Sequence, residues 1–511
     1  TDTIKTLAES VAACKDIDAT YDSLVTKHAE CIEELSIKSK TNFRRIIGEY
    51  FTQLKSDLLF IAKERHLSSQ SLDKVLSYGE LLSTKILAEY LCQIGIPAEQ
   101  LDARKVILTD NYFGHAFVHY QESYNRIRSY FKDRSHIQVI TGFLGSTKTG
   151  ETTTLGRSGS DYTAAIFGAA LNAKIIEIWT DVDGILSANP SIVDSAETIT
   201  YLTYEEAMEL AHAGAKVIFP PAMIPALYKK IPIVIKNTFK PDHPGSIITE
   251  VRSNTGKTVV GISSLSNVTL VRVQGAGMVG MKGMIGRIFS SLAKENINII
   301  LVSQAFSEHS ICFAIKPKWI TSTLKVLEAE FEFELQHHYI DRIKMEEYLS
   351  LVAIVGEGMR HEPGVSGQVF RTLGENNINV IAIAQGSSER NISFIVNDKD
   401  VNTTLNVLHD EFFTIKDEWI EIFLVGVGTI GGELLNIINQ ESPPGISIRA
   451  VCSSRKMLIG SDALNPATAK DKLKKSNMSF GLNDFLSLGN KKNSKQKIFI
   501  DCTASETIAK E

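Results

Sequence analysis

The sequence predicts an α/β protein made of several units, and three observations support this prediction. Residues 1–100 carry apolar side chains at helical spacing, and residues 101–262 alternate short β-branched runs with helical stretches. Residues 263–418 contain one pattern twice, and residues 419–511 open with a strand, a glycine-rich turn and a helix. The 511 residues are enough for about three or four such units.

The first unit is assigned to residues 1–262. Its first 100 residues are expected to be helical because apolar residues recur every three or four positions, as in Phe51, Leu54 and Leu58. Four later runs are strand candidates: 106–108, 137–140, 175–178 and 231–235. Strands that alternate with helices favour a parallel sheet covered by helices.

The middle of the chain is an internal repeat of two units, 263–342 and 343–418. Leu270 matches Leu351 and Gln304 matches Gln385, with the same offset of 81 residues. A constant register across four matches indicates duplication. Each copy reads strand, glycine turn, helix, strand, strand, helix, which is the ferredoxin-like βαββαβ pattern.

Composition and charge narrow the classes of function. The net charge is −5, so there is no electrostatic reason to expect a nucleic-acid partner. The sequence holds no run of about 18 apolar residues, so we expect no membrane span. The six cysteines form no C-x-x-C pair, which favours reduced thiols in the cytoplasm over disulfides or a zinc site. We expect no dedicated metal site.

The first candidate site is the segment from Thr154 to Asp161. Gly156 and Gly159 allow the backbone to approach a ligand closely. A helix that begins here would present free N–H groups to an anion, and Arg157 could bind a carboxylate with two hydrogen bonds. The alternative is a capping loop in which Ser160 or Asp161 is the N-cap.

A second candidate site follows the run at 175–178. Thr180, Asp181 and Asp183 would stand at the carboxyl end of a parallel strand, which suits a nucleotide or Mg²⁺. The alternative is an Asx-type turn before Gly184. Lys216 could bring an ammonium group to a phosphate, although a single lysine carries little information.

These segments together resemble the amino-acid kinase family, and within it aspartate kinase. The resemblance covers residues 1–262 and rests on SYGELLS (77–83), TLGRSGSDYTAA (154–165), IWTDVDGI (178–185), YEEAMELAHAGAKV (204–217) and IPIVIKNTF (231–239). It implies an amino-acid-kinase-like parallel sheet sandwich. It also implies that the chain phosphorylates aspartate with ATP and Mg²⁺.

The resemblance assigns roles to individual residues. The residues implied to bind aspartate are Thr1, Glu80, Arg157 and Ser160. The residues implied to bind ATP are Thr180, Asp181 and Lys216. Asp161 would organise the transferred phosphoryl group, so Asp161 and Lys216 are the catalytic candidates. The side chain of aspartate is already ionised at pH 7, so positioning and charge neutralisation suffice without a general base.

The sequence departs from the kinase family near ATP. Leu186 and Ser191 stand where the family usually has an aromatic residue and an arginine. An alternative reading is therefore a non-catalytic amino-acid sensor with a decayed kinase.

The repeated units resemble ACT domains, which bind amino acids between packed copies. The glycine turns before each helix and the Asn-Ile-Asn that precedes each glutamine carry this resemblance. It implies that Gln304 and Gln385 contact an effector, most simply threonine, in a homodimer or homotetramer. The alternative is that both glutamines only make local hydrogen bonds at strand edges.

The last unit carries Gly426-x-Gly428-x-x-Gly431 between a strand and a helix, as dinucleotide-binding turns do. Arg455 and Lys456 stand after the next strand-like segment, where basic residues favour the 2′-phosphate of NADP(H). Residues 423–505 resemble the start of homoserine dehydrogenase, which implies that residues 419–511 form the first half of a Rossmann domain. The residues implied to contact the cofactor are Gly426, Gly428, Thr429, Ile430, Gly431, Arg455 and Thr503.

The three resemblances together imply the architecture of bifunctional aspartate kinase–homoserine dehydrogenases. Such a protein would also interconvert aspartate semialdehyde and homoserine. An alternative is a monofunctional kinase fused to an NADP-binding module. The chain starts at Thr1, after the family's Lys-Phe-Gly-Gly-Thr-Ser loop, and ends before the dehydrogenase lysines. We therefore expect a piece of a longer protein that shows no turnover by itself.

Overall fold

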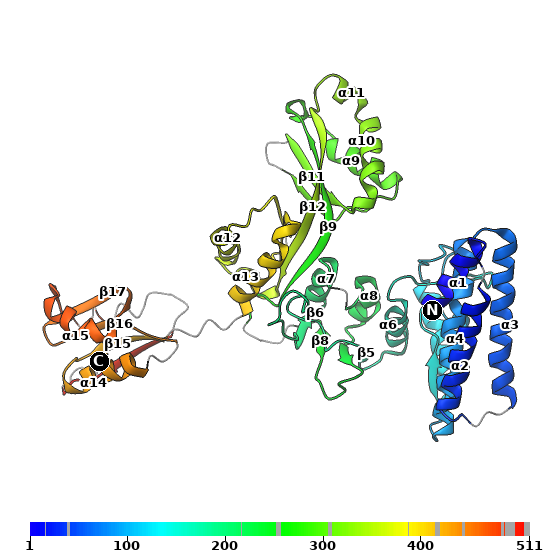
Figure 1. The fold of residues 1–511 in the computed structure, drawn as a ribbon, viewed down its shortest axis with the longest axis horizontal. Helices are drawn as coiled ribbons and strands as arrows, with labels where there is room; N and C mark the ends of the chain where they lie inside the picture. Colours follow the sequence, from blue (N-terminus) through cyan, green and yellow to red (C-terminus); the bar gives the residue numbers. More distant parts are fainter. Residues whose placement is uncertain are drawn as a thin grey trace. The chain divides into compact units, whose positions relative to one another are not determined.

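The structure is a computed structural model, and it divides the chain into two compact units, Thr1–His409 and Asp410–Glu511. Each unit is described by itself (Figure 1). The residues that the structure describes are 1–15, 17–37, 41–215, 217–251, 257–304, 309–386, 388–413, 420–441, 445–481, 485 and 496–504.

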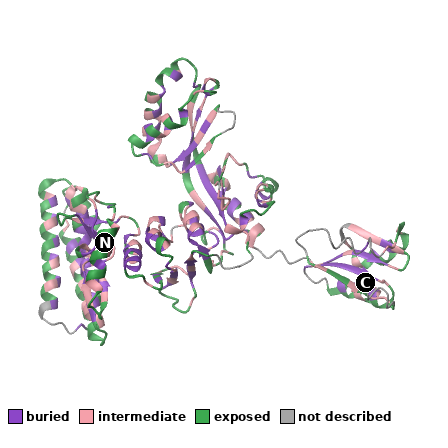
Figure 2. Ribbon diagram, turned by 180° about the vertical axis from the view of Figure 1, so that it is seen from behind, coloured by how far each residue is buried: buried purple, intermediate pink, exposed green. Residues whose placement is uncertain are grey.

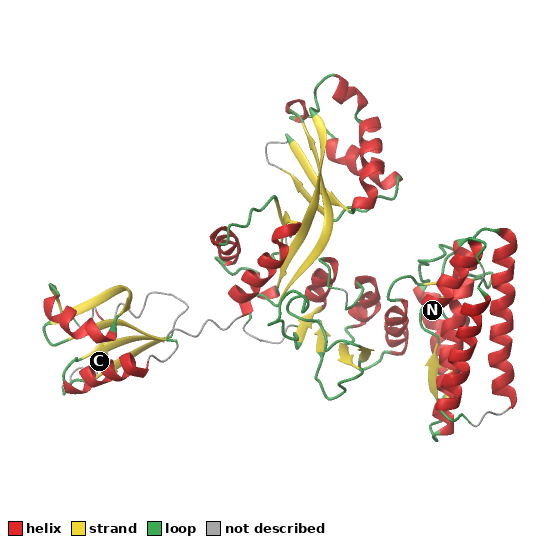
Figure 3. Cartoon of the chain, in the orientation of Figure 1, coloured by secondary structure: helices red, strands yellow, loops and turns green. Residues whose placement is uncertain are grey.

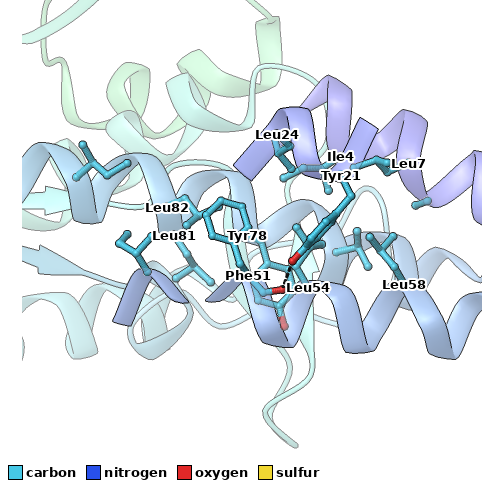
Figure 4. Packing of buried hydrophobic residues seen from close by; sticks show 14 of the residues in the cluster. Ile4, Leu7, Tyr21, Leu24, Phe51, Leu54, Leu58, Tyr78, Leu81 and Leu82 are labelled. Carbon is cyan, nitrogen blue, oxygen red and sulfur yellow. Dashed lines mark hydrogen bonds between the residues drawn. The ribbon is translucent and has the colours of Figure 1, made fainter. Parts of the chain in front are cut away.

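The predicted helical start is confirmed. It consists of α1 (Asp2–Ala12), α2 (Asp18–Glu34), α3 (Thr41–Glu64) and α4 (Ser69–Gln93). Leu54, Leu58 and Leu82 are at most 1% exposed in the core between these helices (Figure 4). In the same core, the hydroxyl of Tyr21 donates to the carbonyl of Phe51 at 2.8 Å. The helical spacing of the apolar residues therefore reflects a real shared core.

A set of short strands follows the helices. The elements are β1 (Ala98–Leu101), η1 (Ala103–Lys105), α5 (Tyr120–Phe131), β2 (Ile137–Ile140), β3 (Leu144–Ser146), β4 (Thr152–Thr154) and α6 (Gly159–Leu171). β1 and β2 pair in parallel, and β3 and β4 pair antiparallel.

The strand expected at 106–108 is wrong, because only an isolated bridge from Leu108 to Ser146 forms there. Val106 and Ile107 are buried, but the N–H groups of both donate to the carbonyl of Ala103 in the turn that ends η1. The apolar run 106–108 therefore indicates burial and not strand pairing.

A four-stranded sheet completes this part. Its elements are β5 (Ile176–Thr180), β6 (Tyr201–Thr203), α7 (Tyr204–His212), α8 (Pro220–Lys229), β7 (Ile233–Asn237) and β8 (Ser246–Thr249). The strand order is β5-β7-β8-β6. β5 is parallel to β7 and β6 to β8, but β7 and β8 are antiparallel, so this sheet is mixed rather than wholly parallel. Its isoleucines pack with apolar residues of α6, α7 and α8.

Both copies of the repeat have the predicted element order, and Figure 3 shows their helices in red beside the yellow strands. The first comprises β9 (Gly261–Gln274), η2 (Ala276–Met278), α9 (Met284–Lys294), β10 (Leu301–Gln304), β11 (Ser310–Ile315), η3 (Pro317–Trp319), α10 (Ile320–Glu330) and α11 (Glu332–Gln336). The second comprises β12 (Arg342–Val355), η4 (Glu357–Met359), α12 (Val365–Glu375), β13 (Ala382–Gln385), β14 (Asn391–Asn397), η5 (Asp398–Asp400) and α13 (Val401–Phe413).

The two copies share one six-stranded sheet, in the order β10-β11-β9-β12-β14-β13. β9 and β12 pair antiparallel from Gln274–Arg342 to Gly261–Val355, and much of their length is buried (Figure 2). The start of β12 therefore completes the first copy, and residues 261–265 complete the second. The two expected boundaries, at 262/263 and 342/343, fall inside these shared strands.

The C-terminal unit begins with the predicted strand, glycine turn and helix. Its elements are β15 (Ile420–Val425), α14 (Thr429–Glu441), β16 (Ile446–Cys452), β17 (Lys456–Leu464), α15 (Pro466–Lys475), β18 (Met478–Ser479) and β19 (Lys497–Asp501). β15 lies between β16 and β19 and is parallel to both. Across the described residues of the whole chain, no helix has the length and apolar character needed to cross a membrane.

Candidate active and regulatory sites

The turn before α6 leaves a helix N-terminus without a side-chain cap. The N-cap is Ser158, in the left-handed region at φ 51°, and it makes no capping hydrogen bond. The alternative in which Ser160 or Asp161 is the N-cap is therefore wrong. Gly156 also has a positive φ, of 77°, and a Cβ there would lie 2.3 Å from Nδ1 of His115. The turn therefore requires glycine and leaves main-chain N–H groups for a ligand.

An open cleft of about 660 Å³ lies beside this turn. Thr1, Glu80, Arg157 and Ser160 all line it. Thr1 is the N-cap of α1, Glu80 lies in α4, and the other two belong to the turn and start of α6. The structure thus brings together the four residues that the sequence resemblance assigned to aspartate.

Charges of both signs face this cleft. Burial raises the pKa of Glu80, while the main-chain N–H of Gly142 donates to its carboxylate and opposes that shift. Arg157 is exposed at the rim, and no described residue forms an ion pair with it. A carboxylate and an unpaired guanidinium across one cleft suit the ammonium and carboxylate groups of an amino acid.

Asp73 is a residue of this site that the sequence analysis missed. It is 1% exposed, and its carboxylate accepts from the N–H groups of Gly114 and Thr154 at 2.8 and 2.9 Å. The hydroxyl of Thr154 donates at 2.7 Å. Burial raises the pKa of Asp73, and these hydrogen bonds oppose the shift. Asp73 thereby ties α4 to two walls of the cleft; its only sequence signal is an acid among apolar helical residues.

The expected nucleotide residues lie at the end of β5. The hydroxyl of Thr180 donates to Asp181 at 3.1 Å, and neither residue lines the 660 Å³ cleft. Asp183 instead accepts from Lys240 and Asn237 at 2.8 and 2.6 Å, which lowers its pKa. Asp183 therefore anchors the turn. Lys216 lies outside the described residues.

Asp161 lies in α6, whereas Leu186 and Ser191, which depart from the family pattern, lie in another segment. Burial raises the pKa of Asp161, and a hydrogen bond from Ser158 opposes the shift. Leu186 forms an isolated bridge with Thr198, and the hydroxyl of Ser191 donates to the side chain of Asn189 at 2.9 Å. Leu186 and Ser191 both belong to the segment 185–198, which follows the turn at Gly184.

The two glutamines of the repeat are both exposed, each at the end of a strand. Gln304, at the end of β10, lines a cavity of about 480 Å³. Methionines contribute much of this cavity, namely Met278, Met281 and Met284. Gln385 is exposed at the end of β13. In this second copy, the carboxylate of Glu389 accepts a hydrogen bond from the N–H of His361 at 2.9 Å. The counterpart of His361 in the first copy is Gly280.

The glycines of the C-terminal unit fit a dinucleotide-binding turn. A Cβ at Gly431 would lie 1.9 Å from the carbonyl oxygen of Gly426, so the helix packs against the strand only without a side chain. A Cβ at Gly428 would meet nothing within 4 Å, which leaves room for a pyrophosphate. A Cβ at Gly426 would lie 2.8 Å from Thr503 Cγ2, so Thr503 stands beside the turn.

The residues expected to contact the cofactor directly are on the surface. Thr429 and Ile430 are exposed at the start of α14, and Arg455 is exposed just after β16. The ammonium of Lys456 donates to the carbonyl of Lys474 at 2.7 Å. Arg455 is therefore the better placed of the two basic residues to meet a 2′-phosphate.

Comparisons with known proteins identify two kinds of domain in the chain. Residues 6–237 match the amino acid kinase family, and residues 271–331 and 352–412 match the ACT domain. Aspartokinase III of E. coli, solved with aspartate and ADP, superposes with a TM-score of 0.69 at 28% identity, covering 80% of this chain and 91% of that one. Residues 6–237 thus match an amino acid kinase domain.

Sequence relatives narrow the class further. A chloroplastic aspartokinase of Arabidopsis thaliana is 34% identical over 409 residues, 76% of this chain and 70% of the relative. The chain belongs to the aspartokinase family, and it has the fold of that family with two ACT domains.

The similarity also reaches beyond the kinase and the ACT domains. A bifunctional aspartokinase/homoserine dehydrogenase of Haemophilus influenzae is 33% identical over 98% of this chain, and one of Zea mays is 31% identical over 96%. The chain spans 63% and 55% of the lengths of these two relatives.

Proposed function

We propose that the protein transfers the γ-phosphoryl group of ATP to the side-chain carboxylate of L-aspartate, forming 4-phospho-L-aspartate and ADP. The observation that carries this proposal is the convergence of Thr1, Glu80, Arg157 and Ser160 on one cleft. The family supports it, because a relative of the same fold was solved with aspartate and ADP. All six cysteines are unpaired, which suits a reducing compartment such as the cytoplasm.

The arrangement suits a reaction that depends on positioning. Arg157 would hold the α-carboxylate of aspartate and Glu80 its ammonium group, so that the side-chain carboxylate points toward ATP. One carboxylate oxygen then bonds to the γ-phosphorus, the bond to the β,γ-bridging oxygen breaks, and ADP leaves. The N–H groups at the start of α6 and the Mg²⁺ bound to ATP would offset the phosphate charge, with Asp161 and Lys216 completing the site.

The test is hydroxamate formation by the full-length protein. With ATP, Mg²⁺ and hydroxylamine, we expect an aspartyl hydroxamate that requires both aspartate and ATP. Reactions without aspartate or without ATP serve as controls. A protein that binds aspartate but forms no hydroxamate would instead be the non-catalytic amino-acid sensor.

We also propose that an amino acid, most simply threonine, inhibits the protein through the ACT units in a homodimer or homotetramer. Because Gln304 lines a cavity of about 480 Å³, Gln304→Ala should weaken inhibition by about tenfold in effector concentration while activity without effector stays unchanged. Gln385→Ala is the matched variant in the second copy and should change inhibition less. The measurement is a threonine titration of kinase activity, and identical curves for both variants and the wild type would show that Gln304 is structural.

We propose that the C-terminal unit is the nucleotide-binding part of an NADP-dependent homoserine dehydrogenase. Bound NADP(H) would supply or accept the hydride that interconverts aspartate semialdehyde and homoserine. Residues 426–431 would hold the pyrophosphate, because the space at Gly428 is open, and Thr503 would lie beside it.

Arg455 should set the preference for the phosphorylated cofactor. Its exposed guanidinium can pair with a 2′-phosphate, so Arg455→Ala should raise the Kd for NADPH by roughly tenfold and leave the Kd for NADH unchanged. Lys456→Ala is the matched control, because its ammonium already bonds to Lys474. Fluorescence titration of the full-length protein measures both constants. Equal affinity of the wild type for NADPH and NADH would contradict the proposed role of Arg455.

A further inference from the structure

The last helix of the second ACT unit, α13, contacts the kinase domain through two polar side chains. His409 is 1% exposed, and its Nε2 lies 2.9 Å from Ser187 Oγ, while its Nδ1 lies 3.2 Å from Ser195 Oγ. One turn earlier, Nδ2 of Asn406 donates to the carbonyl of Ile192 at 3.1 Å. Ser187, Ser195 and Ile192 all belong to the segment 185–198 of the kinase domain.

The duplication shows that these contacts are particular to the second copy. Residues 323–328 of α10 and 404–409 of α13 share the pattern Thr-Leu-x-Val-Leu-x at the repeat offset of 81 residues. The variable positions are Lys325 and Glu328 in the first copy and Asn406 and His409 in the second. Lys325 and Glu328 are exposed. The two helices therefore share the residues of this pattern, and they differ at the two positions that contact the kinase domain in the second copy.

A second contact shows the same difference between the copies. The N–H of Glu357 donates to Oε1 of Glu206 at 2.8 Å, and Nδ2 of Asn391 donates to Oε2 of Glu209 at 2.5 Å. Both glutamates lie on α7, seven residues or more before Lys216 in the sequence. In the first copy, the counterpart of Asn391 is a serine at 310, which has no side-chain amide to donate; the Glu357 contact uses a main-chain N–H, which the counterpart Ala276 also has.

The segment 185–198 connects α13 to the expected nucleotide turn. Ser187 lies three residues after Gly184, and its Oγ accepts from the N–H of Glu197 at 2.9 Å, which closes the segment into a loop. Ile185 is held in turn by Ser246, whose hydroxyl accepts from its N–H at 2.8 Å. Only Ile185 and Leu186 separate Ser187 from the Thr180–Gly184 turn along the chain. By contrast, no described residue of either ACT unit lines the aspartate cleft.

We propose that His409 and Asn406 are positioning residues that hold segment 185–198, and through it the turn at 180–184, in the arrangement that binds ATP. The second ACT unit would then act on the nucleotide half of the kinase domain and not on the aspartate cleft. This inference rests on the proposed kinase function.

The test compares His409→Ala with Glu328→Ala, its register-matched control in the first copy. In the full-length protein, His409→Ala should raise the KM and the calorimetric Kd for ATP about tenfold while the KM for aspartate stays within about twofold. Glu328→Ala should match the wild type. His409→Gln places an amide near the position of Nε2 and should restore ATP affinity if Ser187 is the important partner; His409→Asn should do so if Ser195 is.

The outcomes separate this inference from the proposed function. A wild type that binds ATP but forms no hydroxamate overturns the proposed function alone. A His409→Ala variant with the wild-type Kd for ATP overturns the positioning role. An equal rise in KM for both substrates, with a lower thermal midpoint and no rescue by either amide, would mean that His409 only stabilises the fold, and this result also overturns the inference.

Discussion

Arg157→Ala should raise the KM for aspartate by roughly a hundredfold in the full-length protein. Arg157 stands at the rim of the cleft that also holds Glu80 and Ser160, and no described residue neutralises its charge. Loss of a charged partner from a bound carboxylate costs about 2–5 kcal/mol. We expect a loss of binding free energy near the lower end of that range, because Arg157 is exposed when no ligand is bound. The KM for ATP should change little, since Thr180 and Asp181 do not line this cleft.

Two further variants sharpen this experiment. Arg157→Lys keeps the charge but cannot form the bidentate hydrogen bond to a carboxylate. Its KM for aspartate should therefore lie between that of the wild type and that of Arg157→Ala. Arg126→Ala removes an exposed arginine of α5 and should have no effect. If Arg157→Ala bound aspartate as tightly as the wild type, another residue would hold the substrate carboxylate.

Asp73→Ala should destabilise the kinase domain by about 3–5 kcal/mol. The substitution leaves the N–H groups of Gly114 and Thr154, and the hydroxyl of Thr154, without their acceptor in a buried place. Each unsatisfied buried group costs about 1–3 kcal/mol. For a domain of this size, the first thermal transition of the full-length protein should fall by about 10 °C.

The same measurement includes its own controls. Asp73→Asn keeps one acceptor oxygen and should lose less stability than Asp73→Ala. Glu64→Ala, at the exposed end of α3, should change the free energy of unfolding by less than about 0.5 kcal/mol. A midpoint for Asp73→Ala within 2 °C of the wild type would contradict the view that Asp73 holds the cleft walls together.

Local pattern was sufficient for most of the elements. Helical spacing predicted the four N-terminal helices, and β-branched runs predicted β2, β5 and β7. The same reasoning failed at 106–108, where apolar residues are buried in a turn, and it missed β1, whose sequence is Ala-Glu-Gln-Leu. A short apolar run reports burial, whereas a strand also needs a partner that sequence periodicity cannot identify.

The sequence also predicted some parts of the candidate sites and missed others. Glycine-containing motifs identified both the turn before α6 and the dinucleotide turn, because glycine is required where the backbone has a positive φ or where no Cβ fits. Asp73 was missed because its importance lies in three donors from Gly114 and Thr154, which are 41 and 81 residues away along the chain.

The sequence by itself determined the α/β class, the order of the elements, the duplication and the family resemblance, since these follow from spacing and motifs along the chain. Only the tertiary structure decided that residues 261–265 complete the second copy, that Gln304 lines a cavity, and that His409 meets the kinase domain. Each of these depends on which distant strand or side chain occupies a given space. Two copies with the same local sequence pattern can therefore have different neighbours.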